Sequence, residues 1–273
     1  MAATVVGDEE SPLVLLLHGG GQTRHSWGAV LGALSGAGAR CVALDLRGHG
    51  DSQWAVDGNY RIEAFVEDVV AVLECLDSPA VVVGASLGGM IGLQVASQLG
   101  PDRVRGLVLV DVVLSARREG VERIVNFMTG APEGFESLEA AADAIAAYLP
   151  HRPHRGVTAG LRNNLRRTTD GRWVWHWDPA FLATRRTAEA RRPGPVMLEA
   201  AERILVPLAL VRGRLSDIVD DHGVEELRRL VPHLQVYDVA GAAHTAAADD
   251  NDAFAAAVIE FLDGIQGHQA LSR

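Results

Sequence analysis

The sequence predicts an α/β fold with a mostly parallel central sheet and helices on both of its faces. Short apolar runs alternate along the chain with segments of helical spacing, and parallel strands joined by crossover helices produce that alternation. One apolar run passes through a serine between two glycines directly into a helical pattern. The alternation stops between residues 112 and 205. At 273 residues, the chain is long enough for one large domain with an insertion.

Each predicted element follows from its pattern. Six apolar runs are predicted strands, at residues 13–17, 41–44, 80–83, 107–110, 208–211 and 234–239. Five segments are predicted helices, at residues 26–37, 61–76, 87–99, 224–230 and 252–262. Asp252 is a suitable N-cap for the last helix, because it directly precedes an apolar stripe of helical spacing.

The segment between residues 112 and 205 is predicted to be a helical cap inserted into the α/β core, which takes up residues 1–111 and 206–273. Its apolar residues at helical spacing, such as Leu138, Ala141 and Ile145, need a surface on which to pack. An inserted lid accounts for both the helical patterns and the missing strands.

The net charge and the distribution of apolar residues limit the partners and the cellular location that we expect. The net charge of −10 argues against nucleic acid and anionic membranes as partners. No window is long and apolar enough to span a bilayer, and the N-terminal residues lack a basic stretch followed by an apolar run, so we expect a cytoplasmic protein. Cys41 and Cys75 have neither metal-binding nor redox spacing and are predicted to be buried structural thiols. The oligomeric state stays open.

The serine between glycines, Ser86, has the setting of a nucleophile. It follows a buried strand and precedes a helix, so the chain must turn sharply there. Such a turn leaves no room for side chains two residues before and after the serine, where Gly84 and Gly88 stand. The Gly-x-Ser-x-Gly pattern alone is weak, and its position between strand and helix makes it informative.

Four further motifs accompany Ser86 in order, at residues 15–21 (LLLHGGG), 45–52 (DLRGHGDS), 212–217 (RGRLSD) and 241–244 (GAAH). Together they resemble the α/β-hydrolase fold superfamily, in its capped esterase and lipase-like form, over residues 13–262. Such folds usually open with an antiparallel hairpin before the His-Gly strand, and here only residues 3–6 are available. We therefore expect a shortened N-terminal edge.

The resemblance implies a catalytic triad in the order serine, acid, histidine. Ser86, Asp217 and His244 supply it, since a serine hydroxyl needs a base and the resulting imidazolium needs a carboxylate. Ser216 stands where the commonest family pattern places the acid, and Asp217 is preferred because serine carries no charge. The alternatives to Asp217 are Asp220 and Asp221 in the same loop, and Asp111 at the end of the preceding strand.

The same resemblance places the oxyanion hole at two backbone amides. One is that of Leu87, which begins a helix whose dipole favours an anion. The other is assigned to Gly20, with Gly21 as the alternative and as a residue lining the substrate site. His18 and His49 are interpreted as structural residues that tie loops to the sheet.

No metal or cofactor is predicted. His151 and His154 lack a partner cluster, and the glycine run at residues 19–21 lacks the lysine and the spacing of nucleotide-binding loops. Trp173, Trp175 and Trp177 alternate, so an extended backbone would put their rings on one side. They form either the packing of the cap or an aromatic wall for the substrate.

The predicted function is a serine hydrolase that cleaves a small, apolar carboxylic ester or lactone through an acyl-enzyme, with a small molecule as its only partner. Hydrolysis of carbon–carbon or amide bonds would use the same residues. A fold relative that only binds a small ligand is the other alternative. Epoxide hydrolases and haloalkane dehalogenases are disfavoured, because they need a carboxylate where this chain has Ser86.

Overall fold

The computed structural model describes residues 1–150, 156–185, 194–240 and 252–271. Its main sheet has seven strands in the order β1-β3-β2-β4-β5-β8-β9. The strands are β1 (Ala3–Val6), β2 (Leu13–Leu17), β3 (Arg40–Leu44), β4 (Ala80–Ala85), β5 (Val104–Val110), β8 (Leu208–Gly213) and β9 (Gln235–Val239). Only β1 is antiparallel, and it pairs with β3 at the edge. The mostly parallel sheet and its shortened N-terminal edge are thus confirmed.

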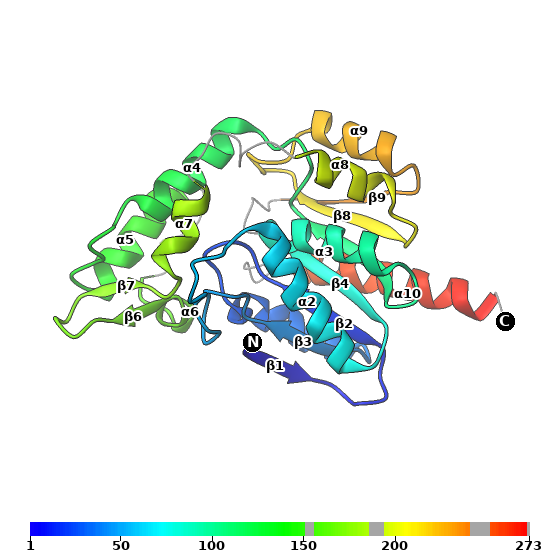
Figure 1. Cartoon of the computed structure of the whole chain (residues 1–273), viewed down its shortest axis with the longest axis horizontal. Helices are drawn as coiled ribbons and strands as arrows, with labels where there is room; N and C mark the ends of the chain where they lie inside the picture. The colour runs from blue at the N-terminus through cyan, green and yellow to red at the C-terminus, as the bar shows by residue number, and fades with distance from the viewer. Residues whose placement is uncertain (151–155, 186–193, 241–251, 272–273) are drawn as a thin grey trace.

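Helices cover both faces of the sheet (Figure 1). One face carries α1 (Gly28–Gly36) and α10 (Asp252–Leu271). The other carries α2 (Ile62–Leu76), α3 (Leu87–Leu99), α8 (Pro195–Glu202) and α9 (Asp221–Leu230). The predicted helix at residues 26–37 is in fact a 3-10 turn, η1 (Arg24–Trp27), followed by α1, and α10 continues beyond residue 262.

The two cores follow from strand periodicity. Every residue of β2 and of β4 is buried, as expected for parallel strands covered on both faces. Successive side chains of a strand point to opposite faces, so Leu13 and Leu15 join the core beneath α2 and α3. Val14 and Leu16 join the core beneath α1 and α10.

The insertion between β5 and β8 lies mostly to one side of the sheet (Figure 1). It contains α4 (Arg118–Thr129), α5 (Leu138–Tyr148), α6 (Ala159–Asn163), the hairpin β6 (Leu165–Arg167) and β7 (Trp173–Trp175), and α7 (Pro179–Arg185). Leu138 and Ala141 are buried in the core cluster shared with α2 and α3. Although α8 falls within the predicted cap range, it contacts α3 and α9, which places it against the α/β core.

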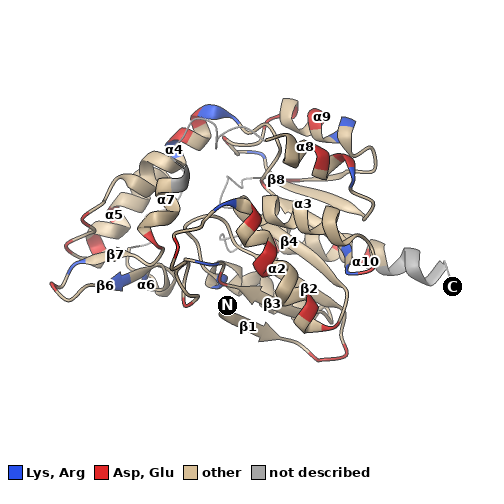
Figure 2. Ribbon diagram, viewed as in Figure 1, with Lys and Arg blue, Asp and Glu red and all other residues tan. Residues whose placement is uncertain are grey.

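Figure 2 marks the positions of charged residues along the ribbon, for example in α2, α9 and β6. Cys41 is buried, and burial raises the pKa of its thiol to about 11. Cys75 is exposed, so the prediction that both thiols are buried is wrong for this residue. On α2 the buried stripe runs through Phe65, Val69 and Leu73, and a residue two positions after Leu73 faces away from it.

No helix in the described ranges is long and apolar enough to cross a membrane.

Helix α3 lies directly against the backbone of β2 and β4. A Cβ atom on Gly88 would collide with the carbonyl oxygen of Leu17 and lie 2.8 Å from that of His18. A Cβ on Gly84 would collide with the carbonyl oxygen of Gly88 and lie 2.6 Å from the amide nitrogen of Gly89. The two glycines that the sequence pattern singled out are therefore required by backbone-to-backbone contact, in which no flexible side chain can yield.

We expect Gly88→Ala to lower the free energy of unfolding by more than about 4 kcal/mol or to prevent folding, because its methyl group meets only backbone. Gly32→Ala is the matched control. Gly32 lies in α1 with nothing within 4 Å of an added Cβ, and its replacement should change stability by no more than about 1 kcal/mol. Urea denaturation measures both. Similar midpoints for the two variants would contradict the close contact of α3 with the sheet.

Candidate active site

Ser86 stands at the junction of β4 and α3 with a strained backbone. Its φ of 48° and ψ of −110° lie in a region that residues other than glycine seldom adopt. The amide of Ser86 donates to the carbonyl oxygen of Val110 at 3.1 Å, which ties the turn to the end of β5. Strain of this kind persists where the surrounding structure enforces it, and it concentrates at functional sites.

Two backbone amides beside Ser86 meet no acceptor among the residues that the structure describes. In the glycine loop, the amide of Gly19 donates to Oε1 of Gln22 at 2.9 Å and that of Gly21 donates to Nε2 of His49 at 3.1 Å. The amide of Gly20, between them, meets no acceptor among the described residues, and neither does that of Leu87, the first residue of α3. A helix N-terminus attracts negative charge, so this pair of amides is suited to bind an anionic oxygen.

His18 and His49 hold loops in place, as expected. Nε2 of His18 accepts from the amide of Leu46 at 3.0 Å, while its Nδ1 donates to the carbonyl oxygen of Gly19 at 2.8 Å. Nδ1 of His49 donates to the carbonyl oxygen of Arg47 at 2.9 Å, which leaves its Nε2 to accept from the glycine loop. Both rings therefore work as neutral imidazoles between two backbone segments.

The insertion is joined to the same loops by buried polar groups. Nδ1 of His176 accepts from the amide of Gly50 at 2.6 Å. The hydroxyl of Tyr60 donates to Asp178 at 2.6 Å, and the Asp178 amide donates to the carbonyl oxygen of Gly48 at 2.9 Å. Burial and the contact with Asp178 raise the pKa of Tyr60 to about 12, so its hydroxyl stays a donor.

Side chains of the insertion cover the glycine loop directly. A Cβ on Gly20 would lie 3.3 Å from Phe181, and one on Gly21 would lie 2.7 Å from Met128 and 3.1 Å from Trp177. Gly21 also has a φ of +77°, which favours glycine independently of the space around it. The loop that offers the Gly20 amide is thus enclosed between the sheet and the insertion.

Asp111 lies at the end of the strand next to the one that leads into Ser86. It follows β5, the neighbour of β4, is fully buried and has a positive φ of 48°. Its carboxylate accepts from the amide of Gly213 at 3.2 Å and from the hydroxyl of Ser216 at 2.7 Å. Ser216, which follows β8, therefore donates a hydrogen bond to the carboxylate at the end of the adjacent strand β5.

The other three candidate acids have different partners. Asp217 forms an ion pair with Arg123 of α4, and its side chain is 25% exposed. Asp220 caps α9 by accepting from the amide of Gly223 at 2.9 Å. Asp221 pairs with Arg212 at 2.8 Å.

His244 lies outside the described residues, as do His151 and His154, so the acid that faces His244 stays a prediction.

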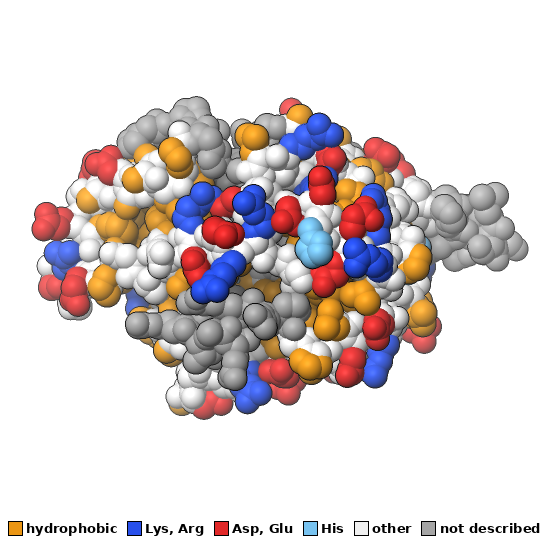
Figure 3. All heavy atoms as spheres, turned by 90° about the horizontal axis from the view of Figure 1, so that it is seen from above, with side chains coloured by type: hydrophobic (Ala, Val, Ile, Leu, Met, Phe, Trp, Pro, Cys, Tyr) orange, Lys and Arg blue, Asp and Glu red, His pale blue; other side chains and the backbone are white. Residues whose placement is uncertain are grey.

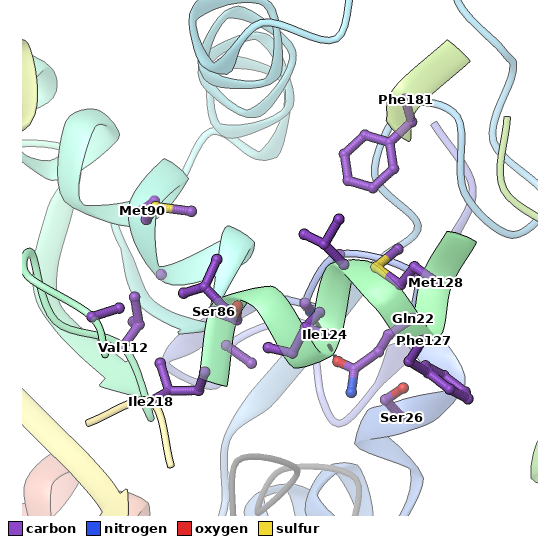
Figure 4. A pocket seen from close by; sticks show the side chains of 18 of the residues that line it. Gln22, Ser26, Ser86, Met90, Val112, Ile124, Phe127, Met128, Phe181 and Ile218 are labelled. Carbon is purple, nitrogen blue, oxygen red and sulfur yellow. Dashed lines mark hydrogen bonds between the residues drawn. The ribbon is translucent and has the colours of Figure 1, made fainter. Parts of the chain in front are cut away.

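A cavity of about 370 Å³ opens at Ser86. Its walls come from the glycine loop, α3, the start of the insertion, α4, α5 and the segment after β7 (Figure 4). No Asp, Glu, Arg, Lys or His side chain is among the described residues that line it. On the face of the molecule that Figure 3 shows, acidic and basic side chains are intermixed. The cavity therefore suits a neutral, largely apolar molecule.

Two of the three predicted tryptophans line this cavity. Trp175 and Trp177 are buried and stacked, with ring centroids 4.8 Å apart. Trp173 is not among the lining residues, and its backbone pairs with Phe135 and with Arg167 in the hairpin. The strand β7 ends at Trp175, so the regular alternation does not extend to Trp177.

Sequence reasoning missed three polar residues of the cavity, which are Gln22, Ser26 and Asn164. Gln22 and Ser26 follow the glycine run closely, and their position beside it was the available signal. Asn164 had none, because it reaches the site only through the folding of the insertion. In the described parts of the chain, no group of three or more His, Cys, Asp or Glu residues could hold a metal ion.

The buried histidines make stability depend on pH. Burial lowers the pKa of His18 and of His176 to about 4, whereas an unfolded histidine titrates near about 6.5. Between these values the unfolded chain binds protons that the folded chain does not, so stability should fall as the pH falls through this window. The slope should reach about 1.4 kcal/mol per pH unit for each histidine.

Urea denaturation at several pH values from 7 to 4.5 measures this slope. His176→Asn keeps an acceptor for the Gly50 amide and removes one titrating group, so the variant should lose part of the slope. An identical slope in the two proteins would contradict the assignment of a neutral, buried His176.

Comparison with known proteins identifies the family. The model of the alpha/beta hydrolase fold family matches residues 12–250. An esterase of Mycobacterium tuberculosis, Rv0045c, is 35% identical over 93% of this chain and 83% of its own length. A solved structure of that esterase has a TM-score of 0.74 and covers 94% of this chain and 86% of the other.

A 3-hydroxybutyrate-oligomer hydrolase of Cupriavidus necator is 31% identical over 87% of this chain and 84% of its own length. The solved structure of an E-2-(acetamidomethylene)succinate hydrolase is 23% identical, has a TM-score of 0.82 and covers 96% of this chain and 94% of the other, which supports the fold alone. The chain belongs to the α/β-hydrolase fold family.

Proposed function

We propose that this protein hydrolyses a small, neutral carboxylic ester or lactone, with Ser86 as nucleophile, His244 as general base and Asp111 as the acid that orients it. The esterase relatives make the chain a carboxylic ester hydrolase. The observation that supports this mechanism is the strained turn at Ser86. Ser86 lines an apolar cavity beside two amides for which the described part of the chain provides no acceptor.

The proposed reaction has two halves. His244 takes the proton of the Ser86 hydroxyl as the oxygen attacks the ester carbonyl, and the oxyanion binds the amides of Gly20 and Leu87. The C–O bond to the alcohol then breaks, and the alcohol leaves with the proton held by His244. Water adds to the acyl-enzyme by the same route, releasing the acid and restoring Ser86.

Asp111 fits the role of the acid better than Asp217, which the sequence favoured. A fully buried carboxylate with two neutral donors is stabilised further by a nearby imidazolium, as forms during the reaction. The Asp217 carboxylate is already paired with Arg123 and directed toward α4. The ends of β4 and β5 are adjacent, so Asp111 starts close to Ser86.

The substrate class follows from the cavity. Its lining is mostly aliphatic and aromatic, and no charged side chain among the described residues would stabilise a charged substrate. We propose that the insertion acts as a cap, with Trp175 and Trp177 as an aromatic wall above the glycine loop. The named relatives act as an esterase and as an oligomer hydrolase, and both names fit an ester bond in a neutral substrate.

A panel of acyl esters and lactones of graded size tests the activity, with Ser86→Ala as the blank. Catalytic efficiency should rise severalfold for each added methylene until the cavity is full, since each buried methylene contributes about 0.8 kcal/mol. Ser86→Ala should fold normally and lose turnover by at least about 10⁴-fold, together with fluorophosphonate labelling. Labelling that persists in Ser86→Ala would refute the nucleophile, and saturable binding without turnover would favour a ligand-binding protein.

The acid is tested by four matched amide substitutions. Asp111→Asn should reduce kcat by about 10⁴-fold near pH 7, because an amide cannot stabilise the imidazolium. Asp217→Asn, Asp220→Asn and Asp221→Asn should each stay within about tenfold of the original kcat, since their observed partners are Arg123, an α9 amide and Arg212. Melting temperatures show which variants remain folded. A large loss in Asp217→Asn with a small one in Asp111→Asn would return the role to Asp217.

A further inference from the structure

The cavity has one polar corner. Most of the side chains that line it are aliphatic or aromatic, whereas Gln22 and Ser26 are polar and lie near one another in Figure 4. Both come from the short segment that follows the glycine loop, and Ser26 belongs to η1. Asn164 of the insertion joins them through Thr23, whose hydroxyl lies 3.5 Å from the Asn164 side-chain oxygen.

The orientation of the Gln22 carboxamide is set by the loop. The amide of Gly19 is a donor, so the carboxamide must turn its oxygen, Oε1, toward it, at 2.9 Å. The Nε2 group then carries its two N–H donors away from Gly19. Among the residues that the structure describes, none accepts from Nε2 of Gln22 and none forms a hydrogen bond with the Ser26 hydroxyl.

This corner lies close to the nucleophile. A Cβ atom on Gly19 would lie 3.4 Å from Cδ of Gln22 and 3.5 Å from Cβ of Ser86, so the two side chains flank the same glycine. A molecule bound at Ser86 therefore places atoms only a few bonds from its reacting carbonyl beside the carboxamide. An apolar group there would leave the donors of Gln22 unpaired, which costs free energy when water is displaced.

We propose that Gln22 and Ser26 determine specificity for esters that carry a second neutral oxygen, such as a keto or second ester carbonyl, within a few bonds of the ester that is cleaved. The inference rests on the proposed ester hydrolysis. Gln22 donates an N–H to that oxygen and the Ser26 hydroxyl donates to it as well. A carboxylate is a poorer fit, because no cationic side chain among the described residues lines the cavity to pair with it.

The experiment compares esters of matched size with and without the second oxygen. Ethyl hexanoate is paired with ethyl 4-oxohexanoate and ethyl 5-oxohexanoate, and butyl butanoate with 3-oxobutyl butanoate, so that both sides of the ester are covered. The readout is the ratio of kcat/KM for the oxo ester to that for the plain ester. If the second oxygen accepts one well-placed hydrogen bond, this ratio should be about ten for at least one pair.

Three variants test whether Gln22 and Ser26 cause the preference for the oxo ester. Ser26→Ala removes the hydroxyl, and Gln22→Glu keeps an acceptor for the Gly19 amide while removing the N–H donors. Each should lower the ratio at least threefold, even where the carboxylate of Gln22→Glu slows both esters. Val121→Ala is the control, because Val121 lines the cavity with an apolar side chain. It should slow both esters of a pair alike and leave the ratio unchanged.

A binding measurement separates this proposal from the proposed function. Titration calorimetry with Ser86→Ala protein should show the oxo ester binding about tenfold tighter than its plain partner. If the Ser86→Ala protein shows this binding preference but the unsubstituted protein cleaves no ester, ester hydrolysis is refuted and the role of Gln22 and Ser26 in binding is supported. Turnover with a ratio near one for every pair, or a ratio that Ser26→Ala and Gln22→Glu leave intact, would overturn the polar corner and leave ester hydrolysis standing.

Discussion

The close contact between α3 and the strands beneath it is the constraint on which the site depends. With Gly84 and Gly88 in place, the helix can begin directly at the end of β4, and Ser86 is forced into its positive φ. The same contact brings the N-terminus of α3 beside the glycine loop, which follows β2. The positions of Ser86, of the helix dipole and of the amides of Gly20 and Leu87 are therefore set by backbone packing, which side-chain motion cannot relax.

Hydrogen bonds join the insertion to the glycine loop by way of the loop that follows β3. His49 connects the glycine loop to the loop after β3, and His176 and Asp178 of the insertion bond to that same loop. The glycine loop and the insertion that covers it are thus held in place by the same loop after β3. On the far side, where the insertion approaches the loop after β8, the amide of Arg117 donates to the carbonyl oxygen of Ile218 at 2.9 Å, and a more exposed ion pair joins Arg123 to Asp217.

The sequence was informative wherever function depends on local backbone. The parallel sheet, the strand-to-helix turn at Ser86 and the loop-holding roles of His18 and His49 all follow from short patterns, and the structure agrees with them. The choice among acids could not be made in this way. Asp217 meets Arg123, 94 residues away in the sequence, and that contact depends on how the insertion folds back.

The cavity lining and the exposure of Cys75 show the same limit. Alternation placed three tryptophans on one side, but β7 is only three residues long, and the chain turns before Trp177. Cys75 stands in an apolar, helical segment, and its exposure depends on which stripe of α2 meets the sheet. Sequence patterns identify helices and strands well. Whether one residue of such an element lines the cavity or faces solvent depends on the packing of the whole molecule.

The way the insertion is attached has a consequence for the evolution of specificity in such folds. It leaves after β5 and returns before β8, and these strands are neighbours, so the sheet could accept a different insertion without a change of strand order. Its buried bonds, however, join Tyr60, Gly48 and Gly50 of the core. An exchanged insertion that lacks counterparts of His176 and Asp178 would leave these groups unpaired. Recombination would therefore succeed only when the insertion and residues 48–60 are inherited together.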